Sequence, residues 1–208
     1  VAVKVHKGSS LEKEAIAEIC KEARIMRHYR HENVIKFYGV AVEKDPLMLV
    51  MELVSGGALD NLLRSKKDDL SQHELLYFAY GAAKGLEYLH ENSCIHRDVA
   101  ARNCLVDGKE VKISDFGLSK ELPRQEAKYK ITDLKQRLPI RWLAPEVMET
   151  ATYSMKSDVF SFGVLLWEDN QKLIECLQWE EHSLRWVSRT SFCSSAHEGV
   201  VTLARKSH

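Results

Sequence analysis

The octapeptide at residues 96–103, His-Arg-Asp-Val-Ala-Ala-Arg-Asn, constrains this chain more than any other stretch. It gathers a carboxylate, an amide, an imidazole and two fixed positive charges, and small alanines let the backbone fold tightly between them. A polar surface turn explains a His-Arg-Asp triplet by itself, but not the whole pattern. The octapeptide therefore predicts a functional loop around which the rest of the chain is organised.

The composition predicts an ordinary globular protein. The 208 residues fit one large domain or two small ones, and 45% hydrophobic residues suffice for a core. Lys and Arg total 30, as do Asp and Glu, so no net charge draws the chain to nucleic acid or a membrane. The longest mostly apolar run, residues 159–167, is too short to span a bilayer.

The two chemical hints to cellular context are the cysteines and the first residue. Five cysteines form no Cys-x-x-Cys pair and leave one odd thiol, so we expect a reducing, cytoplasmic compartment rather than a disulfide framework. No signal peptide pattern is visible, and the first residue is Val1 rather than Met, which suggests a fragment.

The first part of the chain predicts strands and one helix. Residues 1–5 are β-branched and read as a strand carrying Lys4, and Ser9 with Glu12 forms a candidate capping box. Apolar residues at 16, 19, 23 and 26 then follow helical spacing, with Glu22 beside their stripe. Lys4 and Glu22 are either solvated charges or partners. Residues 34–42 and 47–52 predict two more strands around a turn at 44–46.

The second part predicts mainly helices. After Ser55-Gly56-Gly57 a short helix begins at Leu59, and a capping box at residues 71–74 opens a long amphipathic helix ending near Asn92. A hairpin is predicted over 104–113, a long polar connection over 117–146, and a buried helix over 157–167. This order predicts two unequal lobes meeting near residues 53–57, with a cleft between them.

Five features in order resemble the protein-kinase signature: Val1-Ala2-Val3-Lys4, Glu22, the octapeptide, Asp115-Phe116-Gly117 and Ala144-Pro145-Glu146. The resemblance implies an α+β, bilobal protein-kinase-like fold that is partial. Its N-lobe, residues 1–53, is small, β-rich and lacks its first strands. Its C-lobe, residues 54–168, is mainly helical and lacks its last helices. Residues 169–208 form a divergent tail with no family match.

The resemblance also assigns roles for phosphoryl transfer, which depends on positioning and charge neutralisation. Asp98 accepts the substrate hydroxyl proton, and Asp115 and Asn103 supply oxygen ligands to Mg²⁺ or Mn²⁺. Lys4 holds the ATP phosphates and is held by Glu22. Met51 is implied as gatekeeper, with adenine contacts from Ala2, Glu52, Val54 and Leu105. A regulatory spine of Met26, Phe37, His96 and Phe116, and a loop brace from Asp158, are implied as well.

Tyrosine specificity is implied by two features. Ala100 stands where serine/threonine kinases usually carry Lys, with Arg102 completing the loop, and Pro139 and Trp142 resemble the shelf for a phenol ring. Tyr129, among basic residues 124, 128 and 130, is a candidate phosphosite whose phosphate pairs with Arg97. Residues 39–41 and 135–146 look closest to the cytoplasmic Fes/Fer group. The implied partners are ATP and tyrosine-containing proteins, with no nucleic acid and no membrane insertion.

Two departures from the kinase pattern leave alternatives open. No Gly-rich loop precedes Val1, and the pattern is lost after Glu168, where an amphipathic helix over 173–187 is the remaining signal. We therefore expect little or no phosphorylation by these 208 residues themselves. The alternatives to an enzyme are an impaired kinase fragment that binds nucleotide or protein, and a mis-joined gene product.

Overall fold

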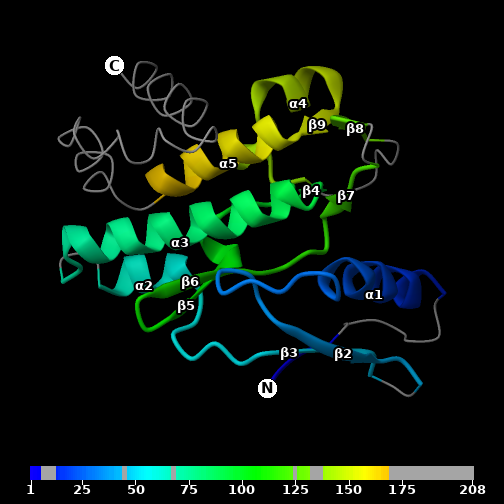
Figure 1. Ribbon diagram of the computed structural model, residues 1–208, viewed down its shortest axis with the longest axis horizontal. Helices are drawn as coiled ribbons and strands as arrows, with labels where there is room; N and C mark the ends of the chain where they lie inside the picture. The colour runs from blue at the N-terminus through cyan, green and yellow to red at the C-terminus, as the bar shows by residue number, and fades with distance from the viewer. Residues whose placement is uncertain (6–12, 44–45, 67–68, 124–125, 132–137, 169–208) are drawn as a thin grey trace.

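In this computed structural model the chain folds into a small lobe of one sheet and one helix and a larger, mainly helical lobe (Figure 1). The structure describes residues 1–5, 13–43, 46–66, 69–123, 126–131 and 138–168. The predicted capping box at Ser9 and Glu12, the turn residues 44–45 and the tail helix over 173–187 lie outside these residues. The two-lobed, mixed α and β architecture confirms the predicted fold class.

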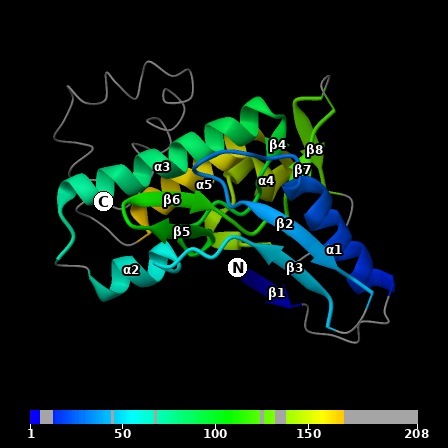
Figure 2. The same ribbon diagram turned by 60° about the horizontal axis from the view of Figure 1, so that its bottom comes forward.

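The small lobe is an antiparallel sheet with strand order β1-β3-β2 and one covering helix (Figure 2). Its elements are β1 (Ala2–Val5), α1 (Lys13–Met26), β2 (Phe37–Ala41) and β3 (Met48–Met51). Ile19, Ala23 and Met26 on α1 are buried, as their helical spacing predicts. This packing brings the face of α1 that carries Glu22 over the sheet, because residues 19, 22, 23 and 26 share one side of the helix.

The strand β2 is shorter than predicted, because residues 33–35 pair with a different partner. Val34 forms an isolated parallel bridge with Ile113, and the Ile35 N–H donates to the Ile113 carbonyl at 2.9 Å. In return, the Ile113 N–H donates to the Asn33 carbonyl at 2.9 Å. The first residues of the predicted strand, Val34 and Ile35, therefore pair with Ile113 of the larger lobe instead of extending β2.

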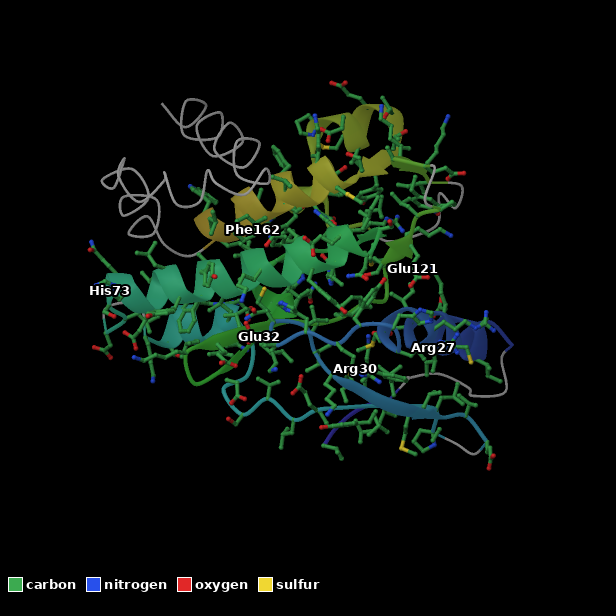
Figure 3. The ribbon with its side chains drawn as sticks, viewed as in Figure 1. Arg27, Arg30, Glu32, His73, Glu121 and Phe162 are labelled. Carbon is green, nitrogen blue, oxygen red and sulfur yellow. The ribbon has the colours of Figure 1, made fainter. Side chains whose placement is uncertain are left out.

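The larger lobe is built on two long helices, α3 (Gln72–Glu91) and α5 (Met155–Trp167), with the shorter α2 (Leu59–Ser65) and α4 (Pro145–Thr150) beside them. The predicted capping box of α3 is confirmed, since Ser71 Oγ accepts the Glu74 N–H while the Glu74 side chain accepts the Ser71 N–H. Phe162 on α5 is buried and lies on the side that faces α3 (Figure 3).

One close contact joins α3 to the segment that leaves the small lobe. A Cβ added at Gly85 would lie 2.4 Å from the Asn33 carbonyl oxygen, so glycine permits the backbones to approach. The Asn33 side chain donates to the Val111 carbonyl at 2.9 Å in the same region. This contact places the segment between α1 and β2 directly against α3.

Short strands and 3₁₀ turns lie between the lobes and also pack against α5. The predicted hairpin is confirmed as β5 (Cys104–Asp107) with β6 (Glu110–Ile113). The long connection adds one strand to each of two small pairs: β4 (Cys94–Ile95) with β7 (Lys120–Glu121), and β8 (Lys128–Lys130) with β9 (Thr152–Ser154). Two 3₁₀ turns, η1 (Ala101–Asn103) and η2 (Ile140–Trp142), carry polar and aromatic side chains. None of the described helices is long and apolar enough to cross a bilayer.

Candidate active site

A cavity of about 260 Å³ lies between the sheet of the small lobe and the β5–β6 hairpin. It is walled by β1, by residues 51–54 that join the lobes, by Leu105 of β5 and by the segment before Phe116. All seven residues predicted to bind ATP line it: Ala2, Lys4, Met51, Glu52, Val54, Leu105 and Asp115. The structure therefore gathers the predicted set from four separate parts of the chain.

Lys4 lies at the centre of the charged end of this cavity. Its ammonium contacts Glu22 Oε1 at 2.9 Å and Asp115 Oδ1 at 3.0 Å. Burial disfavours the charged forms of Lys4 and Asp115, but the attraction between them outweighs it. The pKa of Lys4 is therefore raised, with Glu22 contributing, and the pKa of Asp115 is lowered. Both shifts favour the charged forms of Lys4 and Asp115, which suits an end of the cavity that receives phosphates and a cation.

The segment at residues 51–54 presents backbone groups to the apolar end of the cavity. The Glu52 N–H donates to the Lys36 carbonyl at 2.9 Å, so the Glu52 carbonyl is the group left to meet a ligand there. The Glu52 carboxylate accepts the Lys36 N–H and lies 3.4 Å from the Lys112 ammonium. Ile35 and Leu53 also line the cavity, and sequence reasoning missed both because neither belongs to a motif.

The first half of the octapeptide is held by Asp158 of α5, which is fully buried. Its carboxylate accepts the N–H groups of His96 and Arg97 at 2.7 and 2.8 Å, and it lies 3.0 Å from His90 Nε2. Three contacts offset the cost of burying the carboxylate. They fix a backbone that includes Arg97 in a left-handed conformation, with φ at 69°.

The second half of the octapeptide brings Asp98, Arg102 and Asn103 together. Arg102 forms an ion pair with Asp98, and its guanidinium stacks 4.1 Å from the centre of the Trp142 ring. The Asn103 amide donates to the Asp98 carbonyl at 2.8 Å, which leaves the Asn103 side-chain oxygen for other ligands. Trp142 of the predicted shelf is thereby joined to the predicted proton acceptor through one arginine.

The four predicted spine residues are distributed over both lobes. The rings of His96 and Phe116 pack edge to face at 5.1 Å, and His96 Nε2 lies 3.1 Å from the Ser114 carbonyl. Met26 is buried and Phe37 half-buried, and both belong to the same apolar core as Phe116. Sequence reasoning missed Tyr29, whose ring stacks on Phe116 at 5.9 Å and whose hydroxyl donates to Glu121.

Tyr129 lies on β8 beside Arg97, the pairing partner that the sequence analysis predicted, and beside Lys120, which it did not name. The guanidinium of Arg97 is 5.0 Å from the centre of the Tyr129 ring and 4.4 Å from that of Tyr153, and the Lys120 ammonium is 5.3 Å from Tyr129. Arg124, named with it, lies outside the described residues. Two cationic side chains, Arg97 and Lys120, therefore lie beside the ring of unmodified Tyr129.

Two polar side chains that sequence reasoning missed, one on α5 and one on its C-cap residue, also reach the site. Ser161 Oγ donates to the Trp142 carbonyl at 2.7 Å, and Glu168 Oε2 accepts the Ala101 N–H at 2.8 Å. A signal was present in the sequence, because residues 158, 161 and 168 share one face of a helix. A helix that is otherwise strongly apolar makes such a polar stripe noticeable.

Comparison with known proteins decides the family. A family model described as protein tyrosine and serine/threonine kinase matches residues 1–183. The chain belongs to this kinase family. The matched range contains Lys4, Glu22, the octapeptide and Asp115.

The kinase is similar to curated relatives of the Fer and Fps type, as its resemblance to the Fes/Fer group implied. It is 47% identical to the tyrosine-protein kinase Fer of Homo sapiens over 169 residues, 81% of this chain and 20% of that protein. It is 46% identical to the tyrosine-protein kinase transforming protein Fps of avian sarcoma virus (strain PRCII) over 160 residues, 76% of this chain and 30% of that protein. Fer-related kinase 1 of Caenorhabditis elegans is 46% identical over 169 residues, 81% of this chain and 41% of that protein. The chain thus spans between about a fifth and two fifths of the length of these relatives.

Proposed function

We propose that this kinase transfers the γ-phosphate of ATP to tyrosine hydroxyls of proteins, in non-receptor signalling in the cytoplasm. The observation that supports this most is the convergence of Lys4, Glu22 and Asp115 at one end of a cavity lined by all the predicted ATP residues. The similarity to proteins named tyrosine-protein kinases supports the same reaction. The thiols of Cys20, Cys94 and Cys104 are free, which agrees with a reducing compartment.

Nucleotide binding divides between the two ends of the cavity. Ala2 and Leu105 enclose the adenine ring, and the backbones of Glu52 and Val54 meet its polar edge beside the gatekeeper Met51. Lys4 neutralises the α- and β-phosphates, and Glu22 orients Lys4 through the 2.9 Å ion pair. Adenine therefore takes the apolar end and the phosphates take the charged end.

The residues present fit a divalent cation such as Mg²⁺ or Mn²⁺. Asp115 supplies a carboxylate with a lowered pKa, and Asn103 supplies a side-chain oxygen because its amide nitrogen is occupied by the Asp98 carbonyl. Hard cations bind such oxygens. When bound, the cation neutralises charge on the phosphate oxygens.

Asp98 takes the proton in the transfer. The substrate tyrosine oxygen forms a bond to the γ-phosphorus, the bond from that phosphorus to the β,γ-bridging oxygen breaks, and ADP leaves. The tyrosine proton passes to the Asp98 carboxylate, which Arg102 orients. Pro139 and Trp142 receive the phenol ring, and the Arg102 contact with Trp142 keeps this shelf next to Asp98.

The test is Mg-ATP-dependent phosphate transfer to a Glu/Tyr polymer, with a serine-containing polymer as specificity control. It compares the 208-residue chain with a longer chain to which a Gly-rich hairpin and further C-terminal helices of a relative are added. We expect transfer to tyrosine alone in the longer chain, and loss of it by about 10²-fold or more in Asp98→Asn. Transfer to serine would contradict the specificity, and nucleotide binding without transfer in the longer chain would indicate a binding module instead.

We further propose Tyr129 as a phosphorylated residue. A phosphate on it carries about −1.5 to −2 charges and pairs with Arg97 and Lys120, which already flank the ring at 5.0 and 5.3 Å. Mass spectrometry of the longer chain after incubation with Mg-ATP is expected to find this phosphate, and to find none in Asp98→Asn. A phosphate restricted to other tyrosines would contradict this proposal.

A further inference from the structure

Two polar side chains of α5 and the side chain of its C-cap residue, Glu168, lie on one face of a helix that is mostly apolar. Asp158, Ser161 and Glu168 are spaced by three and seven residues, which places them within a narrow arc at 100° per residue. Each contacts a different functional segment: Asp158 the start of the octapeptide, Ser161 the Trp142 carbonyl and Glu168 the Ala101 N–H. One helix face therefore supports both the loop and the shelf.

The contact made by Glu168 lies at a sensitive point of the loop. Ala101 is fully buried and begins the 3₁₀ turn η1, which also contains Arg102 and Asn103. The first N–H groups of a helical turn have no partner within the turn, so a buried one requires an outside acceptor. The Glu168 carboxylate, at 2.8 Å, is that acceptor.

Hydrogen bonds connect this turn to Ser114, which lines the cavity next to Asp115. The Asn103 N–H donates to the Ala100 carbonyl at 3.0 Å. The Asn103 carbonyl accepts the Ser114 N–H at 2.8 Å and the Ser114 hydroxyl at 2.9 Å. Ser114 adjoins Asp115, so a chain of short contacts leads from Glu168 to both proposed metal-binding residues.

We infer that Glu168 is a positioning residue for the catalytic site: it holds the second half of the loop as Asp158 holds the first. The part of this inference that concerns metal binding rests on the proposed function. The anchoring of η1 through the Ala101 N–H does not. Glu168 touches neither substrate nor metal, and it acts through Ala101 on Asn103.

Residue-resolved amide hydrogen exchange in the 208-residue chain tests the anchoring. In Glu168→Ala we expect exchange at Ala101, Asn103 and Ser114 to accelerate by about tenfold to a hundredfold, since a hydrogen bond to a charged group is lost. Exchange at His96 and Arg97, which Asp158 holds, is expected to stay unchanged. Equal acceleration at all five amides would mean general destabilisation and would overturn the inference, as would no change at Asn103.

Two further variants separate the hydrogen bond from other effects. Glu168→Gln keeps an acceptor and is expected to restore most of the protection. Ala101→Pro removes the donor, and proline is compatible with this first position of η1 because Ala100 is extended, with φ at −158° and ψ at 156°. Ala101→Pro should reproduce the faster exchange at Asn103 and Ser114, and adding Glu168→Ala to it should change little. Additive effects in the double variant would overturn the inference. Glu149→Ala, on the exposed side of α4, is the matched control.

The effect on the metal is tested with Mn²⁺ and a non-hydrolysable ATP analogue. Affinity for the analogue is expected to fall by roughly tenfold in Glu168→Ala when Mn²⁺ is present, and to be unchanged in EDTA, because Asn103 acts only through the cation. An equal loss in both conditions would overturn the positioning of Asn103. If the wild-type chain does not bind the analogue at all, the proposed function fails, while the exchange experiment still decides the anchoring.

Discussion

The octapeptide and the Lys4 cluster, which consists of Lys4, Glu22 and Asp115, are held in place by different interactions. Asp158, His96 and Arg97 are almost fully buried, and backbone N–H groups donate to a carboxylate there. The side chains of Lys4 and Asp115 remain 44% and 48% exposed, and they contact each other through a charged hydrogen bond between side chains. A buried contact of the first kind persists with or without a ligand, whereas a half-exposed ion pair is screened by water and rearranges easily.

This contrast separates two tasks within one site. The loop that carries Asp98 is part of the folded core, so its geometry is set when the chain folds. Lys4, Glu22 and Asp115 form a charged network that an anionic ligand and a cation can redistribute without disturbing the core. Substitutions below the loop should therefore change folding, and substitutions in the Lys4 cluster should change binding.

The largest effect is expected for Asp158→Ala, which breaks the support of the loop. It leaves the buried N–H groups of His96 and Arg97 without their acceptor, at about 1–3 kcal/mol each. We expect the free energy of unfolding in urea to fall by about 2–6 kcal/mol. Asp107→Ala, at an exposed position of β5, is the control and should change it by less than about 0.5 kcal/mol. Similar losses in the two variants would remove the distinction drawn above.

The next effect is expected for Lys4→Met, measured as ATP affinity by calorimetry. Hydrogen bonds to charged groups contribute about 1.5–3 kcal/mol, so the dissociation constant should rise about tenfold to a hundredfold. The loss of unfolding free energy should be smaller than in Asp158→Ala, because Lys4 is partly exposed. Lys4→Arg keeps the charge and should bind more tightly than Lys4→Met. A Lys4→Met variant that loses as much unfolding free energy as Asp158→Ala but binds ATP with normal affinity would reverse the comparison.

A smaller effect is expected for Ser161→Ala, which removes the hydrogen bond to the Trp142 carbonyl. The expected loss is about 1 kcal/mol of unfolding free energy, typical of one buried hydrogen bond. Trp142 should also become more accessible to a fluorescence quencher, while Ser55→Ala in an exposed turn leaves it unchanged. Unchanged quenching in Ser161→Ala would show that η2 holds the shelf without α5.

The smallest effect is expected for Asp115→Asn in the absence of ligand, and it depends on pH. The pKa of Asp115 is lowered in the folded chain, so its ion pair stabilises the fold above the unfolded value of about 3.9 and is lost as pH falls through the folded value. Because Asp115 is half-exposed, we expect the advantage of wild type over Asp115→Asn in urea unfolding to stay below about 1 kcal/mol at pH 7 and to vanish as the pH falls through the lowered pKa of Asp115. An advantage that grows on acidification would contradict the sign.

Much of this architecture could be predicted, because local patterns dominate where a motif or a periodic element exists. The Ser71 capping box fixed the start of α3, and apolar spacing identified the buried side of α1. The ATP-binding residues were predicted as a set and lie together around one cavity, although their roles stay predictions.

The features that escaped prediction depend on contacts between distant elements. Val34 favours a strand, but its neighbours bond to Ile113 across the lobes and shorten β2. Tyr29 looks like an ordinary residue after a helix until its ring meets Phe116, 87 positions away in the chain by their numbers. In the sequence Glu168 is only the residue after which the kinase pattern is lost, and its contact with Ala101 depends on how α5 packs against the loop.

The polar face of α5 also determines where the chain tolerates a change in length. Deleting one residue between Ser161 and Glu168 would turn the latter by about 100° and draw it in by about 1.5 Å, away from Ala101. The residues between them, 162–167, would still be apolar and suited to a core, so composition alone would give no warning. By contrast, a residue added at the exposed Asp107-Gly108 turn would lengthen only a hairpin tip. The number of residues between Ser161 and Glu168 is therefore constrained by the loop, as well as the identity of these two residues.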